Sequence, residues 1–315
     1  MELIIESNKK VYDITQLTTD ITYADKLNDG CSKLDFTFLN DNMNIQNGSV
    51  VRFQYNKAKI FYGFIFKHSR NKNNKTTVTA YDQLRYCKAK DTIVLIGTTE
   101  TDLIKRMCAV FGLHTGTIES TGYILPKGVQ DSKTWLDIAY YGIIETLKSK
   151  NEWYSLRDEY GKIALRNLKN LATNLILGDE SLCYDYSHAK SIDDDFYNQV
   201  KIYVKDEDVK KSKFIAKKSD ESIKKYGLLQ LYEEVDASSY NITQATDRAE
   251  SLLNAYNREA ETLDLECLGD TSIRAGNSFI ANIESLKIKD KRFIVKSVTH
   301  KFIPLHTMSL EVSIW

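Results

Sequence analysis

The chain has 315 residues, in which 43 Lys and Arg balance 43 Asp and Glu, and hydrophobic residues make up 42%. This length suggests two or three domains, and the composition excludes a disordered chain or a coiled coil. A formal net charge of zero leaves no overall field that would draw the chain onto nucleic acid or an anionic membrane, so any partner is recognised locally. It also removes long-range repulsion between copies, which suits a subunit that associates.

Signals for export, membrane insertion or disulfide bonding are missing from the sequence. Met1 to Lys10 lack the basic start and long apolar stretch of a signal peptide. The longest apolar run, Ile60 to Phe66, is far shorter than the roughly 20 residues that span a bilayer, so we expect no membrane anchor. The cysteines have no CxxC spacing, and we expect reduced, mostly buried thiols. They are Cys31, Cys87, Cys108, Cys183 and Cys267.

Residues 1–88 alternate between apolar and polar positions, as half-buried strands do. Leu34, Phe36 and Phe38 lie between polar neighbours, and residues 51–55 repeat the pattern. Gly63 interrupts an aromatic-rich strand, which is typical of a bulge or a bend at a barrel corner. The pattern predicts an antiparallel meander or barrel.

The period changes after residue 90. Leu103, Ile104, Met107, Cys108 and Phe111 share one helical face, and this helix is expected to start at a capping box of Thr99 with Asp102 and to stop at Gly112. A second amphipathic helix is predicted at roughly 132–150. Residues 152–157 and 162–167 are predicted to form a hairpin. Together these elements predict a small α/β module.

The β pattern returns near residue 180. Val200, Ile202 and Val204 alternate with polar residues, charges cluster in a hairpin at 206–218, and a short helix is predicted at 220–226. The strongest helix of the chain is predicted at about 242–260. Four further strands follow it, and the last, 306–315, alternates without a break.

These patterns predict an α+β fold that is mainly β. We expect two small tube-like β-barrel domains that flank and pack against a small α/β module. The expected domains are residues 1–88 (N-terminal barrel), 89–175 (α/β module) and 176–315 (C-terminal barrel with a long inserted helix).

Motifs for common chemistry are absent. No two glycines are spaced as GxG, so neither a dinucleotide fingerprint nor a phosphate-binding loop is present. HExxH and GxSxG are missing as well. We therefore predict no enzyme, no cofactor, and no catalytic, cofactor-binding or metal-binding residues.

Two groups of residues that contain histidine have both a functional and a simpler interpretation. His300 and His306 could converge with Cys267 on a metal, but histidines that hydrogen-bond to nearby backbone at strand ends are far more common. Cys108 and His114 resemble a nucleophile and its base, yet Cys108 lies on an apolar helix face, where a buried, inert thiol is expected.

Each cluster of charged residues also has a functional and a simpler interpretation. The run Asp193, Asp194 and Asp195 lacks the spacing of a calcium loop and fits a solvated turn. Asp158 and Glu159 are adjacent turn residues, whereas a glycosidase needs carboxyls facing each other across a sugar. One compact basic patch suits phosphate contacts, although a solvated hairpin tip is more common. It consists of Lys67, His68, Arg70, Lys72 and Lys75.

Several segments together resemble the baseplate hub proteins of phage contractile tails and of R-type bacteriocins, the prophage tail-hub or late-control family. The likeness spans nearly the whole chain and depends on the order and spacing of the segments. They are Tyr81 to Leu84, Asp102 to Leu113, Leu156 to Lys162, Ser222 to Gly227, the Ala-rich helix to Ala260, Leu268 to Asp270, Ile273 to Gly276, His300, and His306 to Met308.

The resemblance implies a structural protein. It would be a homotrimer whose subunits each contribute two barrels to a pseudo-sixfold ring. The ring would adapt the sixfold tail tube protein to the threefold central spike and anchor other baseplate proteins, and nucleic acid or a tape-measure protein would pass through its lumen. The protein would assemble in the bacterial cytoplasm and end in the tail baseplate of a virion or a released bacteriocin.

Two alternative functions remain open at this stage. A peptidoglycan hydrolase is suggested by the enzyme label of some related hub proteins and by the many acidic residues. A cell-wall-binding tail protein is suggested by 19 tyrosines and 12 phenylalanines, although most of these lie in strand alternation, where aromatics fill cores and interfaces.

Overall fold

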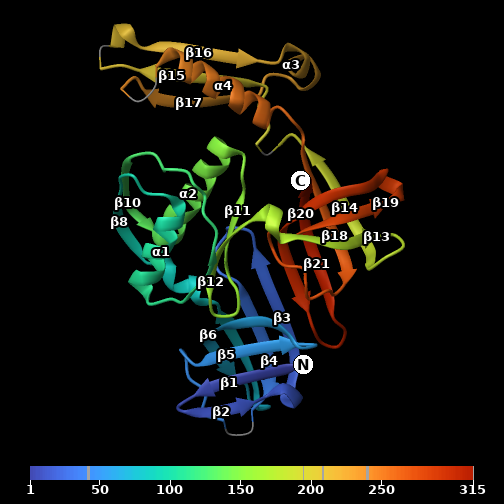
Figure 1. The fold of residues 1–315 in the computed structure, drawn as a ribbon. Helices are drawn as coiled ribbons and strands as arrows, with labels where there is room; N and C mark the ends of the chain where they lie inside the picture. The colour runs from blue at the N-terminus through green and yellow to red at the C-terminus, as the bar shows by residue number, and fades with distance from the viewer. Residues whose placement is uncertain (41–42, 194, 208, 239–240, 315) are drawn as a thin grey trace. The chain divides into compact units, whose positions relative to one another are not determined.

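The computed structural model describes residues 1–40, 43–193, 195–207, 209–238 and 241–314. Contacts within the chain divide it into two compact units (Figure 1). The first unit comprises Met1–Ser187 and Asp264–Trp315, and the second comprises His188–Leu263. Within the described ranges, no helix is long and apolar enough to cross a membrane.

The N-terminal part of the first unit is an antiparallel β structure. Its strands follow the spatial order β3-β4-β7-β6-β5-β1-β2. Alternate residues such as Leu34, Phe36 and Phe38 are buried in one aromatic-rich core, as their alternation predicts. The strands are β1 (Glu2–Ser7), β2 (Lys10–Asp13), β3 (Thr18–Lys26), β4 (Lys33–Leu39), β5 (Val50–Tyr55), β6 (Ala58–Arg70) and β7 (Lys75–Tyr81).

Strand β6 pairs with two different strands along its length. Its first half pairs with β5, and its second half pairs with β7, where the register shifts between Ile65 and Lys67. Gly63 lies just before this shift, and a Cβ there would be 2.2 Å from the carbonyl oxygen of Tyr81. The glycine is thus required because another backbone approaches closely, rather than because it is itself the bulge.

The C-terminal part of the first unit continues the same sheet. Strand β20 (Ile288–Lys301) pairs with β21 (Thr307–Ile314) on one side and with β3 on the other, so that the first and last parts of the chain lie side by side (Figure 1). The row runs onward to β18 (Ala260–Leu268) and β14 (Cys183–Ser191). Strands β13 (Ala172–Gly178) and β19 (Ser278–Ile283) pair in parallel, and β19 joins them to β20.

The middle of the chain forms the expected α/β module. Helices α1 (Glu100–Phe111) and α2 (Trp135–Lys150) each begin at a capping box, of Thr99 with Asp102 and of Thr134 with Asp137. The second cap starts α2 three residues later than predicted. One core joins the helices to two small sheets. The strands are β8 (Lys90–Leu95), β9 (Thr115–Ile118), β10 (Gly128–Thr134), β11 (Tyr154–Asp158) and β12 (Ile163–Asn167).

The second unit is a three-stranded sheet with helices. Strand β15 (Gln199–Lys205) lies between β16 (Lys213–Lys218) and β17 (Gln230–Asp236). Helix α4 (Ile242–Tyr256) covers one sheet face through Ala245 and Ala249, and α3 (Asp220–Tyr226) connects β16 to β17. Helix α4 ends before the predicted residue 260, because strand β18 begins there.

The predicted mainly β, α+β fold is confirmed. The structure adds two features that the sequence did not predict. Among the described residues, the N-terminal and C-terminal β regions share one 13-stranded sheet through the β3–β20 pair, and residues 188–263 form a compact unit of their own. Hydrophobic alternation marks strands but not their partners, so neither detail was visible in the sequence. The division at residues 88 and 175 stays a prediction.

Candidate functional site

A buried polar cluster joins three parts of the first unit. Arg274 lies in the loop before β19, and its Nε lies 2.9 Å from Oδ2 of Asp25 on β3. Its Nη1 donates to the carbonyl oxygen of Asp158 in the middle module at 2.8 Å. The guanidinium also lies over the ring of Tyr23, 5.7 Å from its centroid. One arginine therefore contacts the N-terminal sheet and the middle module.

Two aspartates extend this cluster. Asp82 accepts hydrogen bonds from the backbone and the hydroxyl of Ser32, at 2.7 and 2.6 Å. Asp158 accepts from the side-chain amide of Gln83 at 3.0 Å and from Gly161 N. Burial, and then the charge of Asp158, raise the pKa of Asp82. The bonds between Gln83 and Asp158 attach the segment after β7 to the β11–β12 turn.

His300 and His306 lie beside this cluster. Nδ1 of His300 lies 3.0 Å from Nε2 of His306, and Nε2 of His300 lies 2.9 Å from the carbonyl oxygen of Ile273. The His306 ring stacks on Phe302 at 4.4 Å between centroids. Burial lowers the pKa of His300 to about 4 and also lowers that of His306, so both rings are neutral near pH 7.

The metal hypothesis for these histidines finds no geometric support. The thiol of Cys267, its suggested third ligand, is buried among the apolar residues of β18. Within the residues that the structure describes, no three His, Cys, Asp or Glu side chains gather as metal ligands would. All five cysteines are free thiols, and Cys87, Cys108 and Cys267 are buried. The reduced, mostly buried cysteines are thereby confirmed.

The hypothetical nucleophile Cys108 and its base His114 differ in burial. Cys108 is buried in the core of the middle module, and burial raises its pKa to about 11. A thiol with such a pKa stays protonated near pH 7 and is a poor nucleophile. His114 is exposed beyond the end of α1.

The acidic residues weighed as catalytic engage separate partners. Glu159 pairs with Arg166 at 3.2 Å, whereas Asp158 binds Gln83 on another element. Asp193 donates its backbone N–H to the Ser191 hydroxyl. Asp194, in the middle of the hypothetical calcium run, lies outside the described residues.

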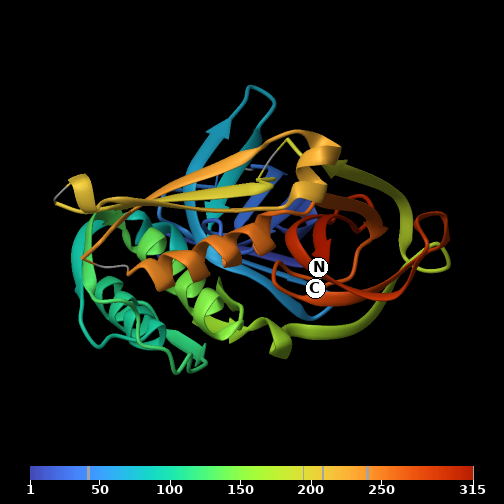
Figure 2. The same ribbon diagram turned by 90° about the horizontal axis from the view of Figure 1, so that it is seen from above.

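The basic patch lies at the tip of the β6–β7 hairpin, as predicted. Every residue from Lys67 to Lys75 is exposed. Arg70 donates to the carbonyl oxygen of Asn40 at 3.3 Å and to Oδ1 of Asn74 at 2.8 Å. Figure 2 shows this hairpin projecting from the first unit. Its cations are therefore available to a partner.

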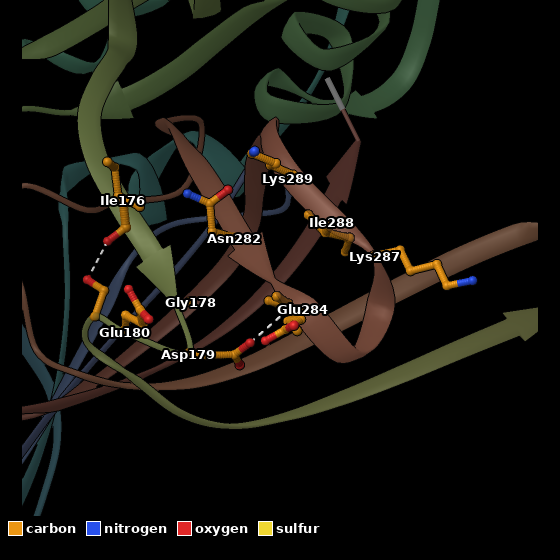
Figure 3. A pocket seen from close by; sticks show the side chains of 11 residues that line it. Ile176, Gly178, Asp179, Glu180, Asn282, Glu284, Lys287, Ile288 and Lys289 are labelled. Carbon is orange, nitrogen blue, oxygen red and sulfur yellow. Dashed lines mark hydrogen bonds between the residues drawn. The ribbon is translucent and has the colours of Figure 1, made fainter.

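A groove of about 770 Å³ lies at the β13–β19 end of the first unit (Figure 3). Ile176, Ile283 and Ile288 supply apolar lining. The Asp179 carboxylate accepts from Glu284 N at 2.8 Å and holds the turn at one end of the groove. No local pattern in the sequence indicates this groove, because its walls come from strands that lie far apart in the chain.

Aromatic side chains form a row along the partly exposed face of β6. The rings of Tyr62 and Phe64 lie 5.9 Å apart, and Phe64 and Phe66 both contact Tyr86 at 5.6 and 5.5 Å. Arg85 lies over the ring of Phe66 at 5.3 Å. Partly exposed aromatics with a nearby arginine are typical of protein contact surfaces.

The polar cluster was also missed from the sequence, although one signal existed. Arg274 lies between Ile273 and Ala275, which are both buried, and a cation inside an apolar run predicts a buried ion pair. Nothing local indicated Asp25 as its partner, because 249 residues separate the two.

Comparison with known proteins places this architecture in a family. The model of a family described as YQBQ-like matches residues 21–313. The uncharacterized protein YqbQ of Bacillus subtilis (strain 168) is 28% identical over 276 residues, which cover 85% of this chain and 82% of YqbQ.

Solved structures share the fold at low sequence identity. The 43 kDa tail protein of prophage MuSo2 from Shewanella oneidensis has a TM-score of 0.71 at 10% identity, covering 100% of this chain and 98% of that protein. The tail protein of Neisseria meningitidis MC58 has a TM-score of 0.70 at 12% identity, with 99% and 95% covered. The E. coli c3393 protein, described as a type VI secretion component similar to T4 tail proteins gp27 and gp5, has a TM-score of 0.57 at 9% identity, with 95% and 73% covered.

Proposed function

The chain belongs to the YqbQ-like family, and from this premise we propose that it is a structural baseplate hub of a phage-type contractile particle. In this role it forms a trimeric ring that adapts a sixfold tail tube to a threefold spike. The particle is a phage tail or an R-type bacteriocin. Its role is mechanical and requires no catalytic residue.

One feature of the sheet carries the proposal. From the central pair β3–β20, the row continues on one side as β3-β4-β7-β6-β5-β1-β2 and on the other as β20-β21-β18-β14. Each subunit thus presents two rows of strands, of unequal length, in one continuous sheet. Three such subunits supply six rows, which match a sixfold tube, while the whole chain keeps the threefold symmetry of a spike.

The buried polar cluster supports a mechanical role for the chain. Arg274, Asp25 and Asp158 connect the two rows and the middle module by charged hydrogen bonds, which are stronger and more directional than apolar contacts. Such bonds fix the angle between parts. A ring that must match a tube on one side needs a fixed angle.

The similar structures support the same role. Two of them are described as tail proteins and one as a type VI secretion component. By analogy, the partners of this chain are the tail tube protein, the central spike and other baseplate proteins. Nucleic acid or a tape-measure protein would pass through the ring.

The test is the stoichiometry of assembled particles. We expect particles purified from a producing strain to contain three copies of the chain for each spike trimer, by quantitative mass spectrometry. Deleting its gene should leave tails without a baseplate. A chain absent from particles whose deletion leaves complete tails would refute the hub.

A further inference from the structure

Strands β14 and β18 are neighbours in the large sheet, and their contacts fix their register. At one end of the pair, the N–H of Leu268 donates to the carbonyl oxygen of Leu182 at 2.8 Å. Further along, Nε2 of His188 on β14 lies 2.7 Å from the Glu261 carboxylate on β18. Residue numbers rise on one strand while they fall on the other, so the two strands run antiparallel.

This register places two cysteines opposite each other. Cys183 and Cys267 are the next residues inward from the bonded pair of Leu182 and Leu268, and they form a non-hydrogen-bonded pair. Opposed residues of an antiparallel ladder point to the same sheet face, and the Cα atoms of such a pair lie about 4.5 Å apart. A disulfide spans this separation. The two thiols can therefore be joined with little movement of either strand.

The two thiols differ in exposure and in acidity. Cys183 is partly exposed, whereas Cys267 is buried. The neighbouring Cys267 thiol lowers the pKa of Cys183, while the Cys183 thiol and then burial raise the pKa of Cys267. The thiolate is the nucleophile in disulfide exchange. Cys183 is thus the thiol that an external oxidant meets first, and Cys267 is the second thiol that completes the bond.

The other three cysteines are less reactive. Cys87 and Cys108 are buried in the core of the middle module, and Cys31 packs against that core. Burial raises the pKa of Cys31 and Cys87 to about 12 and that of Cys108 to about 11. Thiols with such pKa values stay protonated near pH 7. Among the five cysteines, Cys183 is therefore the one best suited to react.

The Cys183–Cys267 pair lies where the chain passes between its two compact units. The first unit is interrupted after Ser187 and resumes at Asp264, so residues 188–263 are inserted between β14 and β18. Strand β14 also ends the row of strands in the described part of the sheet. An edge strand is held from one side only and opens more readily than a central strand. A bond between the two cysteines would hold this edge and close the insertion into a covalent loop.

We propose that Cys183 and Cys267 form a redox site, which is reduced inside the cell and becomes a disulfide after the particle is released. The oxidant is a small-molecule disulfide. The Cys183 thiolate attacks one of its sulfurs, so that a mixed disulfide forms and one small thiol leaves. The Cys267 sulfur then attacks the Cys183 sulfur and displaces the second small thiol. Two protein thiols are oxidised, and their two protons end on the two small thiols.

The change of compartment gives this site its use. Thiols are kept reduced in the cytoplasm, whereas the surroundings outside the cell are oxidising. Closing a long loop stabilises a protein mainly by constraining its unfolded chain. A particle would thus gain stability after it leaves the cell. The inference rests on the proposed function only for this passage, because the reaction of the two thiols is a property of the chain itself.

The experiment uses the full chain, purified in reducing agent and then transferred to oxidised glutathione. Cys183→Ser and Cys267→Ser each remove one partner of the pair. Cys31→Ser is the matched control, since it removes another partly exposed cysteine of the same unit. Peptide mass spectrometry identifies the linked cysteines, and thermal unfolding with and without dithiothreitol measures the effect on stability.

We expect the wild type and Cys31→Ser to lose about 2 Da and to yield a linked peptide pair that contains Cys183 and Cys267. Oxidation should raise their unfolding temperature by roughly 5–10 °C, and reduction should reverse the change. Neither serine variant of the pair should show this shift. Cys267→Ser should instead retain glutathione on Cys183, because the thiol that displaces it is missing.

Three results would overturn the inference. They are a wild type that keeps both thiols after oxidation, a linkage between other cysteines, and a folded Cys267→Ser variant that takes up no glutathione at Cys183. A separate arm traps the thiols of freshly released particles with iodoacetamide. Particles that contain the chain with both thiols reduced contradict the inference and leave the hub proposal intact. If particles lack the chain while the purified chain forms the bond, the hub is refuted and the redox site stands.

Discussion

Arg274 and Asp25 are 249 residues apart in the chain and meet in an ion pair of 2.9 Å that is largely buried. The pair joins the loop before β19 to strand β3. It therefore connects the two rows of the sheet independently of the β3–β20 ladder.

Arg274→Met should destabilise the first unit strongly. The change leaves the Asp25 carboxylate buried without its partner, and such losses cost about 3–5 kcal/mol. Urea denaturation would measure the change in free energy of unfolding. As a control, Arg52→Met breaks an exposed pair with Glu6 and should cost at most about 1 kcal/mol.

The double change Asp25→Leu with Arg274→Met should recover part of that loss. It removes the unpaired charge and leaves apolar groups in its place. If Arg274→Met alone costs no more than the Arg52 control, the pair does not stabilise the connection.

The His300–His306 pair predicts a loss of stability in mild acid. Burial lowers the pKa of His300 to about 4 in the folded chain, from an ordinary value of 6.5. The unfolded chain then binds the extra proton between about pH 6.5 and 4, so the contribution is fully present above pH 6.5 and is lost as the pH falls. It amounts to roughly 3 kcal/mol at most.

His300→Gln should remove this part of the pH dependence, since an amide can still donate to the Ile273 carbonyl and does not titrate. Unfolding free energies measured at pH 7 and pH 4.5 would show a smaller difference than in the wild type. His114→Gln, at an exposed position, is the control. An equal pH dependence of the unfolding free energy in the wild type and in His300→Gln would contradict the prediction.

Glu100 lowers the stability of the middle module. Its carboxylate is fully buried against Gly142, and neither oxygen has a hydrogen-bond partner. Burial raises its pKa well above 4.5, so the penalty is absent in acid and grows as the pH rises through that range. Glu100→Met should stabilise the chain at pH 7 by about 1–3 kcal/mol.

The favourable position of an acid at a helix start is worth less than this penalty, about 0.3–1 kcal/mol. Thermal unfolding at pH 7 and pH 4.5 would reveal the gain and its decrease in acid. Lys105→Met, on the exposed face of the same helix, is the control. A destabilised Glu100→Met variant would mean that the carboxylate has a partner.

Gly63→Ala should disturb the bend of β6. The new methyl group would lie 2.2 Å from the Tyr81 carbonyl oxygen and 2.5 Å from Cζ of Phe61. Overpacking of this kind costs about 1–3 kcal/mol. Gly128→Ala is the matched control, since a Cβ there meets nothing within 4 Å. Equal urea midpoints of the two variants would show that the backbone adjusts freely.

The local elements of this protein could be predicted from the amino-acid sequence alone. Alternation at Leu34, Phe36 and Phe38 identified β4, and the capping residues Thr99 and Gly112 located the ends of α1. Such signals involve neighbours within a few residues, where steric and hydrogen-bonding preferences act directly. The mainly β fold class follows from their sum.

Which strands lie side by side was visible only in the folded chain. The β3–β20 pair and the Arg274–Asp25 contact both join residues far apart in sequence. A strand's alternation shows which of its faces is buried but not which strand lies beside it. The basic hairpin tip could be predicted from residues 67–75 alone, because its charges are neighbours in the sequence.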